Sequence, residues 1–344
     1  MMIYRLQGCK KSAVIGWMAG MLLLAGCAQD KPADTSQGEM LPEGKYPMTF
    51  TVTGLEATAT TRGTTDGTWD GGKEVAVQVG DVVKKYVADG SGESTTLQPA
   101  DSDDAFYWQN TKDTKQVSAW YLGKGYNNNP PTKTRGWQWS VQSDQNNNGY
   151  QNSDFLYAPQ TACSFGGTNS LTFSHKTAKV VINIRKYGVA TDDKDIESIT
   201  ICNTMLTGST AEINGELKFS GNAESSSSRQ SITPYKLSVQ NENVSFEANK
   251  HAETALASYQ ALVIPDNDIH LISIEIKMKG YALFKYNLVV SVVPGVSGKW
   301  ESGMQYTYNL TIKGSKVTAT VSDTEMTWED GDNGGSGGNG SVEI

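Results

Sequence analysis

The segment Met48-Thr49-Phe50-Thr51-Val52-Thr53 alternates apolar and polar side chains. Successive side chains of an extended strand point to opposite faces, so this alternation predicts a β-strand with one buried face. The same period recurs in short runs bounded by Gly, Asn, Asp or Pro, at 75–79, 117–121, 171–173, 272–278 and 306–312. After the N-terminal apolar stretch, only 249–257 has the composition of a short helix. The sequence therefore predicts an all-β protein with antiparallel sandwich or barrel domains.

The first 26 residues have the organisation of an export signal. Three basic residues precede an apolar stretch over 13–25 that is too short to span a bilayer comfortably. Leu24-Ala25-Gly26-Cys27 then forms a lipobox, the bacterial signal for cleavage before a lipid-modified cysteine. The alternative is a plain signal peptide followed by an unrelated cysteine. The lipobox predicts a mature lipoprotein that begins at Cys27 and is attached to a membrane without spanning it.

Composition divides the rest of the chain into four parts. Residues 27–45 are polar, which predicts a flexible tether. The remaining length suits about two domains, at roughly 150 residues each. A second strand-dense block begins directly after residue 175, so we expect an N-terminal β-sandwich domain over 46–175 and a C-terminal one over 176–328. A Gly-rich tail follows over 329–344.

Charge and motifs exclude several classes of function. The formal net charge is −8, and loss of the three positive charges of the signal makes it −11. Such a surface repels phosphate backbones, so nucleic acid is not an expected partner. The three histidines are scattered, and no nucleotide-binding, hydrolase or zinc-binding spacing is present. We expect no enzyme, no cofactor and no metal, with His175 in a structural hydrogen bond.

Two pairs of residues are candidates for a special role. Cys163 and Cys202 remain in an exported chain, either as a disulfide or as two separate buried thiols. Trp137 and Trp139 lie one residue apart between Asn-rich runs, so in an extended segment they share one face. Exposed indoles stack on sugars, which would make the protein a glycan-binding surface lipoprotein. The alternative is that both rings fill a core.

An ordered set of motifs resembles the fimbrillin family of Bacteroides-type (type V) pili. After the lipobox the set comprises 50–53, Ala59-Thr60-Thr61-Arg62-Gly63, 106–108, 118–121, 154–158, 171–181, 261–265 and 300–310. The resemblance covers essentially the whole mature chain. It implies an outer-membrane lipoprotein with two transthyretin-like β-sandwich domains in tandem.

The resemblance also implies a route of assembly into a cell-surface fimbria. In pilus-forming members an arginine-specific protease removes the first strand, and Arg62-Gly63 matches the cut position here. The gap left in the sheet then accepts a strand from the next subunit. Repeated head to tail, this exchange gives a polymer of pilin subunits that serves adhesion to a host protein or glycan.

The donor of such a strand has one candidate. Lys316–Val321, with the segment that follows to Trp328, alternates as a donor strand must. The alternative is that it forms the last strand of its own domain, in a hairpin with 306–312 across Gly314-Ser315. The Gly-rich tail makes a poor donor because glycine weakens strands. Two roles therefore stay open for this chain: a shaft subunit, or an anchor or accessory subunit that keeps its lipid.

Overall fold

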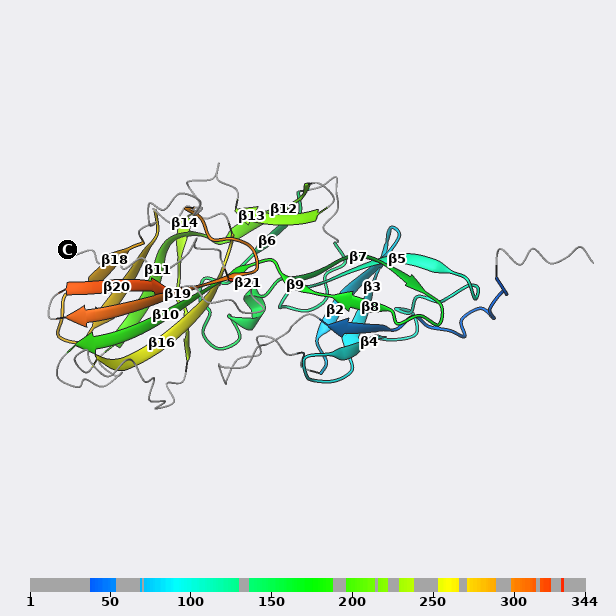
Figure 1. Cartoon of the computed structure of the whole chain (residues 1–344), viewed down its shortest axis with the longest axis horizontal. Coiled ribbons are helices and arrows are strands. Elements are labelled where there is room, and N and C mark those ends of the chain that lie inside the picture. The colour runs from blue at the N-terminus through cyan, green and yellow to red at the C-terminus, as the bar shows by residue number, and fades with distance from the viewer. Residues whose placement is uncertain are drawn as a thin grey trace, which may run out of the picture. The chain divides into compact units, whose positions relative to one another are not determined.

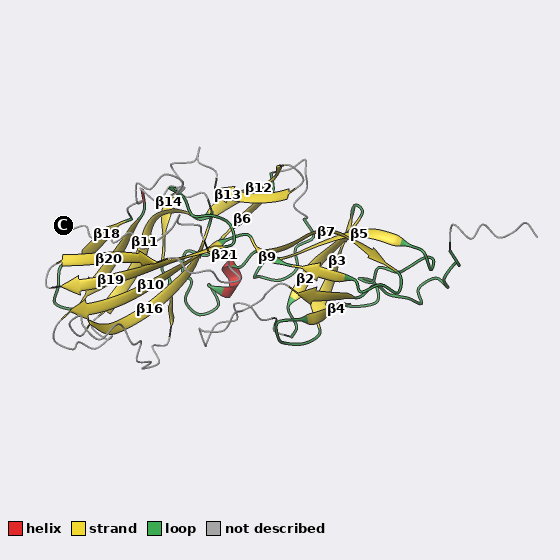
Figure 2. Ribbon diagram, in the orientation of Figure 1, coloured by secondary structure: helices red, strands yellow, loops and turns green. Residues whose placement is uncertain are grey.

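The computed structural model is built almost entirely of strands (Figures 1 and 2). It describes residues 38–53, 69, 71–129, 136–187, 196–213, 216–221, 229–237, 253–265, 271–288, 298–313, 316–322 and 329–330. One turn of 3-10 helix, η1 (Gln151–Ser153), is the single named helix within these ranges. None of the helical elements described has the length and apolar character needed to span a bilayer. The prediction of an all-β protein is confirmed.

The first sheet has the strand order β8-β1-β4-β3-β2-β5-β7-β9. Its strands are β1 (Phe50–Thr53), β2 (Glu74–Val79), β3 (Val82–Ala88), β4 (Thr95–Pro99), β5 (Thr114–Tyr121), β7 (Leu156–Ser164), β8 (Ser170–Thr172) and β9 (Ser174–His175). All neighbours are antiparallel except β1 and β8, which are parallel. Gly80, at φ +58°, begins the two-residue turn between β2 and β3, where the backbone must be left-handed.

The remaining strands form three further sheets. A six-stranded sheet runs β15-β16-β10-β19-β20, with β21 also on β19; a four-stranded sheet runs β14-β11-β17-β18; and a three-stranded sheet runs β13-β12-β6. The bounds are β6 (Gln138–Ser140), β10 (Ala178–Tyr187), β11 (Ile196–Met205), β12 (Thr207–Ile213), β13 (Glu216–Gly221), β14 (Arg229–Ile232), β15 (Tyr235–Leu237), β16 (Glu253–Val263), β17 (Ser273–Met278), β18 (Phe284–Asn287), β19 (Met304–Lys313), β20 (Lys316–Ser322) and β21 (Glu329–Asp330).

The apolar alternations seen in the sequence account for two separate cores. One core, called the first core or β1 core below, gathers side chains of β1, β2, β4 and β5, among them Phe50, Val75 and Val117. The other gathers the inward faces of β10, β17 and β19, among them Ile182 and Ile274. The strands change from the first sheet to the second between β9 and β10, close to residue 175. The strand β6 is an exception, since it lies before this point but pairs with β12.

Two local predictions are corrected. The short helix expected over 249–257 is wrong for 253–257, because β16 begins at Glu253 and pairs with β10 over its whole length. Pairing in the sheet and burial of Leu256 and Ala257 outweigh the helical propensity of this Ala-rich stretch. The flexible tether expected over 27–45 extends too far, because Glu39 and Leu41 already hydrogen-bond to the 109–111 backbone.

The segment considered as a donor strand follows the hairpin alternative. β20 pairs antiparallel with β19 from Thr307↔Ser322 to Lys313↔Lys316. Val317 is buried in the second core, as its place in the apolar alternation predicts. The segment therefore pairs with the strand that precedes it in the same chain, and the residues that follow it to Trp328 lie outside the described ranges.

Candidate functional site

The strand β1, the first of the chain and blue in Figure 1, occupies an interior position in the first sheet. On one side it pairs antiparallel with β4, through Phe50↔Leu97 and Val52↔Thr95. On the other side it pairs parallel with β8, through Thr51↔Ser170 and Val52↔Leu171. Interior strands satisfy backbone donors and acceptors on both neighbours, so loss of β1 would leave two strand edges unpaired.

The apolar side chains of β1 and of the residue before it are part of the core. Met48 is 1 % exposed, and Phe50 and Val52 are 0 % exposed. The ring of Phe50 lies 5.5 Å from that of Tyr86, between centroids. Tyr86 Oη donates to the Met48 carbonyl at 3.2 Å and accepts from the Phe106 amide, also at 3.2 Å. Burial raises the pKa of Tyr86 far above its usual value, so this hydroxyl stays protonated as a donor.

The chain upstream of β1 is held by a different partner. Met48 N–H donates to the Phe106 carbonyl at 2.7 Å, and Trp108 N–H donates to the Tyr46 carbonyl at 3.0 Å. Further along, Leu41 N–H donates to the Gln109 carbonyl at 2.9 Å. The stretch 39–53 therefore runs first along 106–111 and then between β4 and β8. Its removal would open a groove along all three of these segments.

The groove would be lined by backbone edges and by apolar pockets. The strand β8 has β1 as its one hydrogen-bonded neighbour among the described strands, whereas β4 keeps β3. The pockets of Met48, Phe50 and Val52 would become exposed at every second position, which is the spacing of one strand face. An extended peptide with alternating apolar side chains fits such a groove by β-augmentation.

The predicted processing and lipidation residues lie outside the described residues. These are Cys27, Arg62 and Gly63. Two described positions bracket Arg62 in the sequence, the end of β1 at Thr53 and the fully buried Trp69. Trp69 packs against Phe173 at 5.2 Å between ring centroids, within the same core as β1. A cut at Arg62 would therefore separate β1 from the rest of the chain without interrupting any described strand.

The two tryptophans proposed as glycan contacts pack against other aromatic rings. Both Trp137 and Trp139 lie 5.6 Å from the ring of Phe155, and Trp139 lies 5.9 Å from that of Phe219. Trp139 is 9 % exposed and Trp137 is partly buried against the second core. Indoles placed in this way fill a core, as the alternative interpretation of the sequence had it. Trp139 has no broad exposed face for a sugar.

The two cysteines are not joined. Cys163 is buried in β7 beside the β1 core, Cys202 is partly buried in β11, and both are free thiols. Of the two alternatives drawn from the sequence, the structure shows the second, two separate thiols, and they lie in different sheets. Burial raises the pKa of the Cys163 thiol to about 11 and also raises the pKa of Cys202.

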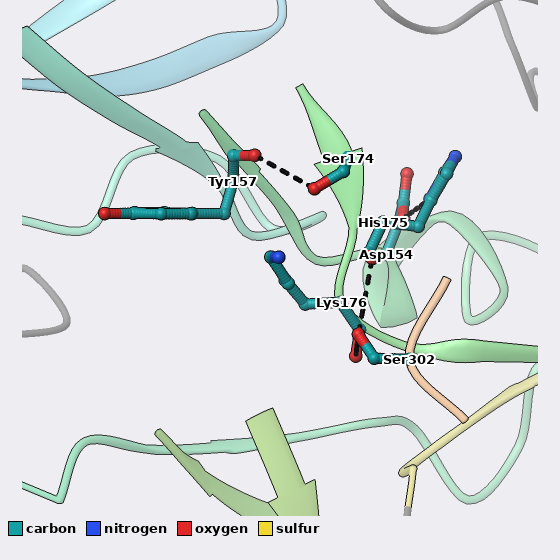
Figure 3. A network of polar contacts seen from close by, with 6 residues as sticks. All are labelled: Asp154, Tyr157, Ser174, His175, Lys176 and Ser302. Atoms are coloured by element: carbon teal, nitrogen blue, oxygen red, sulfur yellow. Dashed lines mark hydrogen bonds and ion pairs between the residues drawn. The ribbon is translucent and has the colours of Figure 1, made fainter. Parts of the chain in front are cut away.

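His175 lies in a polar network where the first sheet passes into the second (Figure 3). Its Nδ1 is 2.9 Å from Asp154 Oδ1, which is the structural hydrogen bond expected from the sequence. Ser302 Oγ donates to the Lys176 carbonyl at 3.1 Å, and Ser174 Oγ to the Tyr157 carbonyl at 3.5 Å. The two serines of this network thus bond backbone carbonyls. The described residues contain no group of His, Cys, Asp and Glu side chains that could hold a metal ion.

The sequence pattern predicts strands at β1 and at 171–173, but it does not predict that β1 pairs with β4 and β8 or lies along 106–111. The parallel partner β8 lies more than a hundred residues further along, and the 106–111 segment has no regular alternation. Parallel pairing between distant short strands leaves no local signal, because neither a turn nor a helix connects them directly. The alternation of 171–173 was the one usable sign that β8 exists.

Both the sequence and the fold of this chain are similar to those of known proteins. A family model described as fimbrillin-like matches residues 61–328. The fold is similar to that of a proposed cell adhesion protein from Bacteroides uniformis, with a TM-score of 0.57, 16 % identity, and coverage of 82 % of this chain and 98 % of that chain. It is also similar to one from Bacteroides ovatus, with a TM-score of 0.56, 18 % identity, and coverage of 76 % and 88 %. None of the curated proteins matches this chain.

Proposed function

Because this chain belongs to the fimbrillin-like family, we propose that it is a structural subunit of a cell-surface fimbria whose first strand is removed by proteolysis and replaced by a strand of another subunit. Membership confirms the resemblance drawn from the sequence motifs. It also supports assembly with other pilin subunits at the cell surface, and a structural role rather than an enzymatic one.

The interior position of β1 is the observation that carries the exchange proposal. β1 is bonded on both sides and contributes fully buried side chains, yet it is joined to the rest of the chain only through the stretch that contains Arg62. A single cut can therefore convert an integral strand into a removable peptide. A second copy that donates a strand to the vacated groove makes a heterologous contact, which propagates as a fibre.

The donor must come from a strand that can leave its own sheet. β20 is a candidate because it lies at the end of its sheet, with β19 as its one hydrogen-bonded neighbour among the described strands. Its residues Val317, Ala319 and Val321 alternate with polar ones, as Met48, Phe50 and Val52 do. Donation would require the β19–β20 hairpin to open. A subunit that keeps β20 in place would act as an anchor or accessory member, held at the outer membrane by lipid on Cys27.

The test uses a soluble chain that begins at Ala28 and an arginine-specific protease. We expect a new N-terminus at Gly63 by mass spectrometry, followed by SDS-resistant ladders and fibres. Arg62→Ala should abolish both. The matched control is Arg135→Ala, since Thr134-Arg135-Gly136 repeats the local sequence of Thr61-Arg62-Gly63. Its ladders should form as in the unmodified chain.

Two results would contradict the proposal. A chain cut at Arg62 that stays monomeric at all concentrations would exclude strand exchange. Native surface protein whose N-terminus remains at lipid-bearing Cys27 would exclude processing and leave the anchor role.

A further inference from the structure

The connection between β5 and β7 leaves the first sheet and joins the strands of the second half of the chain. Its described part, residues 136–155, is called the strap below. Within the strap, β6 pairs antiparallel with β12, with Trp139 opposite Gly208. At one end of this ladder Thr210 N–H donates to the Trp137 carbonyl at 2.8 Å, and at the other Val141 N–H donates to the Leu206 carbonyl at 2.9 Å. The strap is therefore a structural part of the second half.

A buried glutamine fixes the middle of the strap. Gln145 is 0 % exposed, and its side chain bonds both backbone groups of Leu262 in β16. Gln145 Nε2 donates to the Leu262 carbonyl at 2.7 Å, and Leu262 N–H donates to Gln145 Oε1 at 2.8 Å. Its backbone N–H donates to the Thr233 carbonyl at 2.9 Å. The side-chain amide thus replaces a strand neighbour at the point where β15 no longer pairs with β16.

The end of the strap joins the two cores. Phe155 is fully buried and lies 5.1 Å from Phe219 of β13, between ring centroids. The next residue, Leu156, begins β7 and is buried in the β1 core. Adjacent side chains on opposite faces thus belong to different cores, as expected for an extended segment.

At Ala76 and Trp120, the strands β2 and β5 are also buried on the face turned away from the β1 core. Val77 and Ala119 belong to the β1 core. Their neighbours Ala76 and Trp120, 0 % and 1 % exposed, belong with Phe155 to the core of the second half. The outer face of the first sheet is therefore covered by the second half at β2 and β5, and neither of these strands is a neighbour of β1.

From this arrangement we propose that the strap and the shared core form a brace that keeps β2, β5 and β7 folded when β1 is absent. Loss of β1 removes its core side chains and leaves β8 without a paired strand, but it leaves the braced faces of β2 and β5 unchanged. When β1 is absent, β4 then still lies next to an ordered sheet, and its free edge can pair with a new strand. The proposal rests on the proposed function of the groove and adds the means by which an emptied subunit persists.

The experiment expels β1 without cutting the chain. Phe50→Asp with Val52→Asp places two charges in an apolar core, where burying them is prohibitive, so β1 must leave. Hydrogen exchange with mass spectrometry on the whole mature chain should show lost protection in 39–53, 106–111 and β8. Protection in β5 and β7 should stay within about tenfold of the unmodified chain.

The brace is then tested in the same background. Adding Gln145→Ala should raise exchange in β5 and β7 by a further factor of about ten to a hundred. Adding Asn148→Ala, an exposed position of the same strap, should not. With native β1, Gln145→Ala should leave β5 and β7 protected, because the β1 core suffices there.

Three outcomes would overturn the brace. They are equal loss of protection in β5, β7 and β8 when β1 is expelled, no effect of Gln145→Ala in that background, and loss of protection from Gln145→Ala with native β1. The measurement requires no fibre. A chain that never exchanges strands can still show the brace, and a failed brace leaves the ladder test of exchange unaffected.

Discussion

Truncation of Phe50 tests whether β1 is an integral part of the core. The side chain is 0 % exposed and packs on Tyr86 inside the first core. Replacing a buried phenylalanine by alanine costs about 3–5 kcal/mol, from lost apolar transfer and the cavity that remains. Phe50→Ala should therefore lower the free energy of unfolding of the first sheet by that amount. The control Thr51→Ala, exposed on the same strand, should cost about 1 kcal/mol at most.

The assay is urea unfolding followed by hydrogen exchange at the amides of β4 and β8, which report the region around β1 rather than the whole chain. Since 1.4 kcal/mol corresponds to a factor of ten, about 3 kcal/mol also predicts that β1 leaves the groove roughly a hundred times more often. A cost below about 1 kcal/mol for Phe50→Ala, or equal costs for both variants, would refute the integral role of β1.

Three further predictions concern the remaining interior. Gln145→Ala should cost about 1–3 kcal/mol in urea unfolding because it leaves two buried backbone groups unbonded, whereas equality with Asn148→Ala would contradict this. Because burial raises the pKa of Cys163 from 9.0 to about 11, its contribution to stability is fully present below pH 9 and is lost as the pH rises through 11. Urea midpoints should therefore fall less steeply over this range in Cys163→Ala than in the parent, and unchanged steepness would count against it. Gly208→Ala should cost about 1–3 kcal/mol, since a Cβ there would lie 2.6 Å from the ring of Phe219, while Gly136→Ala, with nothing within 4 Å, should change the midpoint little.

The sequence predicts the strands best where one face is buried and the other is not. Met48, Phe50 and Val52 alternate with threonines, and the structure buries them as that period requires. The segment at 253–257 shows the opposite case. Alanine and glutamate favour a helix locally, but β10 provides a pairing edge and an apolar surface that outweigh a propensity of a few tenths of a kcal/mol per residue.

The strap could not be predicted from its own residues. Its three-residue strand β6 is too short to show a period, and its partner β12 lies almost seventy residues away. The Asn-rich run beside Gln145 indicates a loop, and 146–149 is indeed a turn, but Gln145 itself is completely buried. A buried glutamine is satisfied by tertiary partners, here Leu262, and these leave no trace in the local pattern.

In the proposed scheme, a cut at Arg62 leaves every described contact of β1 in place. It changes only the connection, because an intact chain presents β1 to its groove at an effective concentration in the millimolar range, which no diffusing donor matches. After the cut, β1 is held by its backbone bonds and by three buried apolar side chains, each contributing about 1.5–3 kcal/mol. That sum, about 4.5–9 kcal/mol, corresponds to dissociation constants from the submillimolar to the submicromolar range, so the cut fragment is bound reversibly and a donor strand competes with it. Proteolysis therefore permits exchange without completing it, and the groove empties when a strand with its own three matching side chains displaces the first.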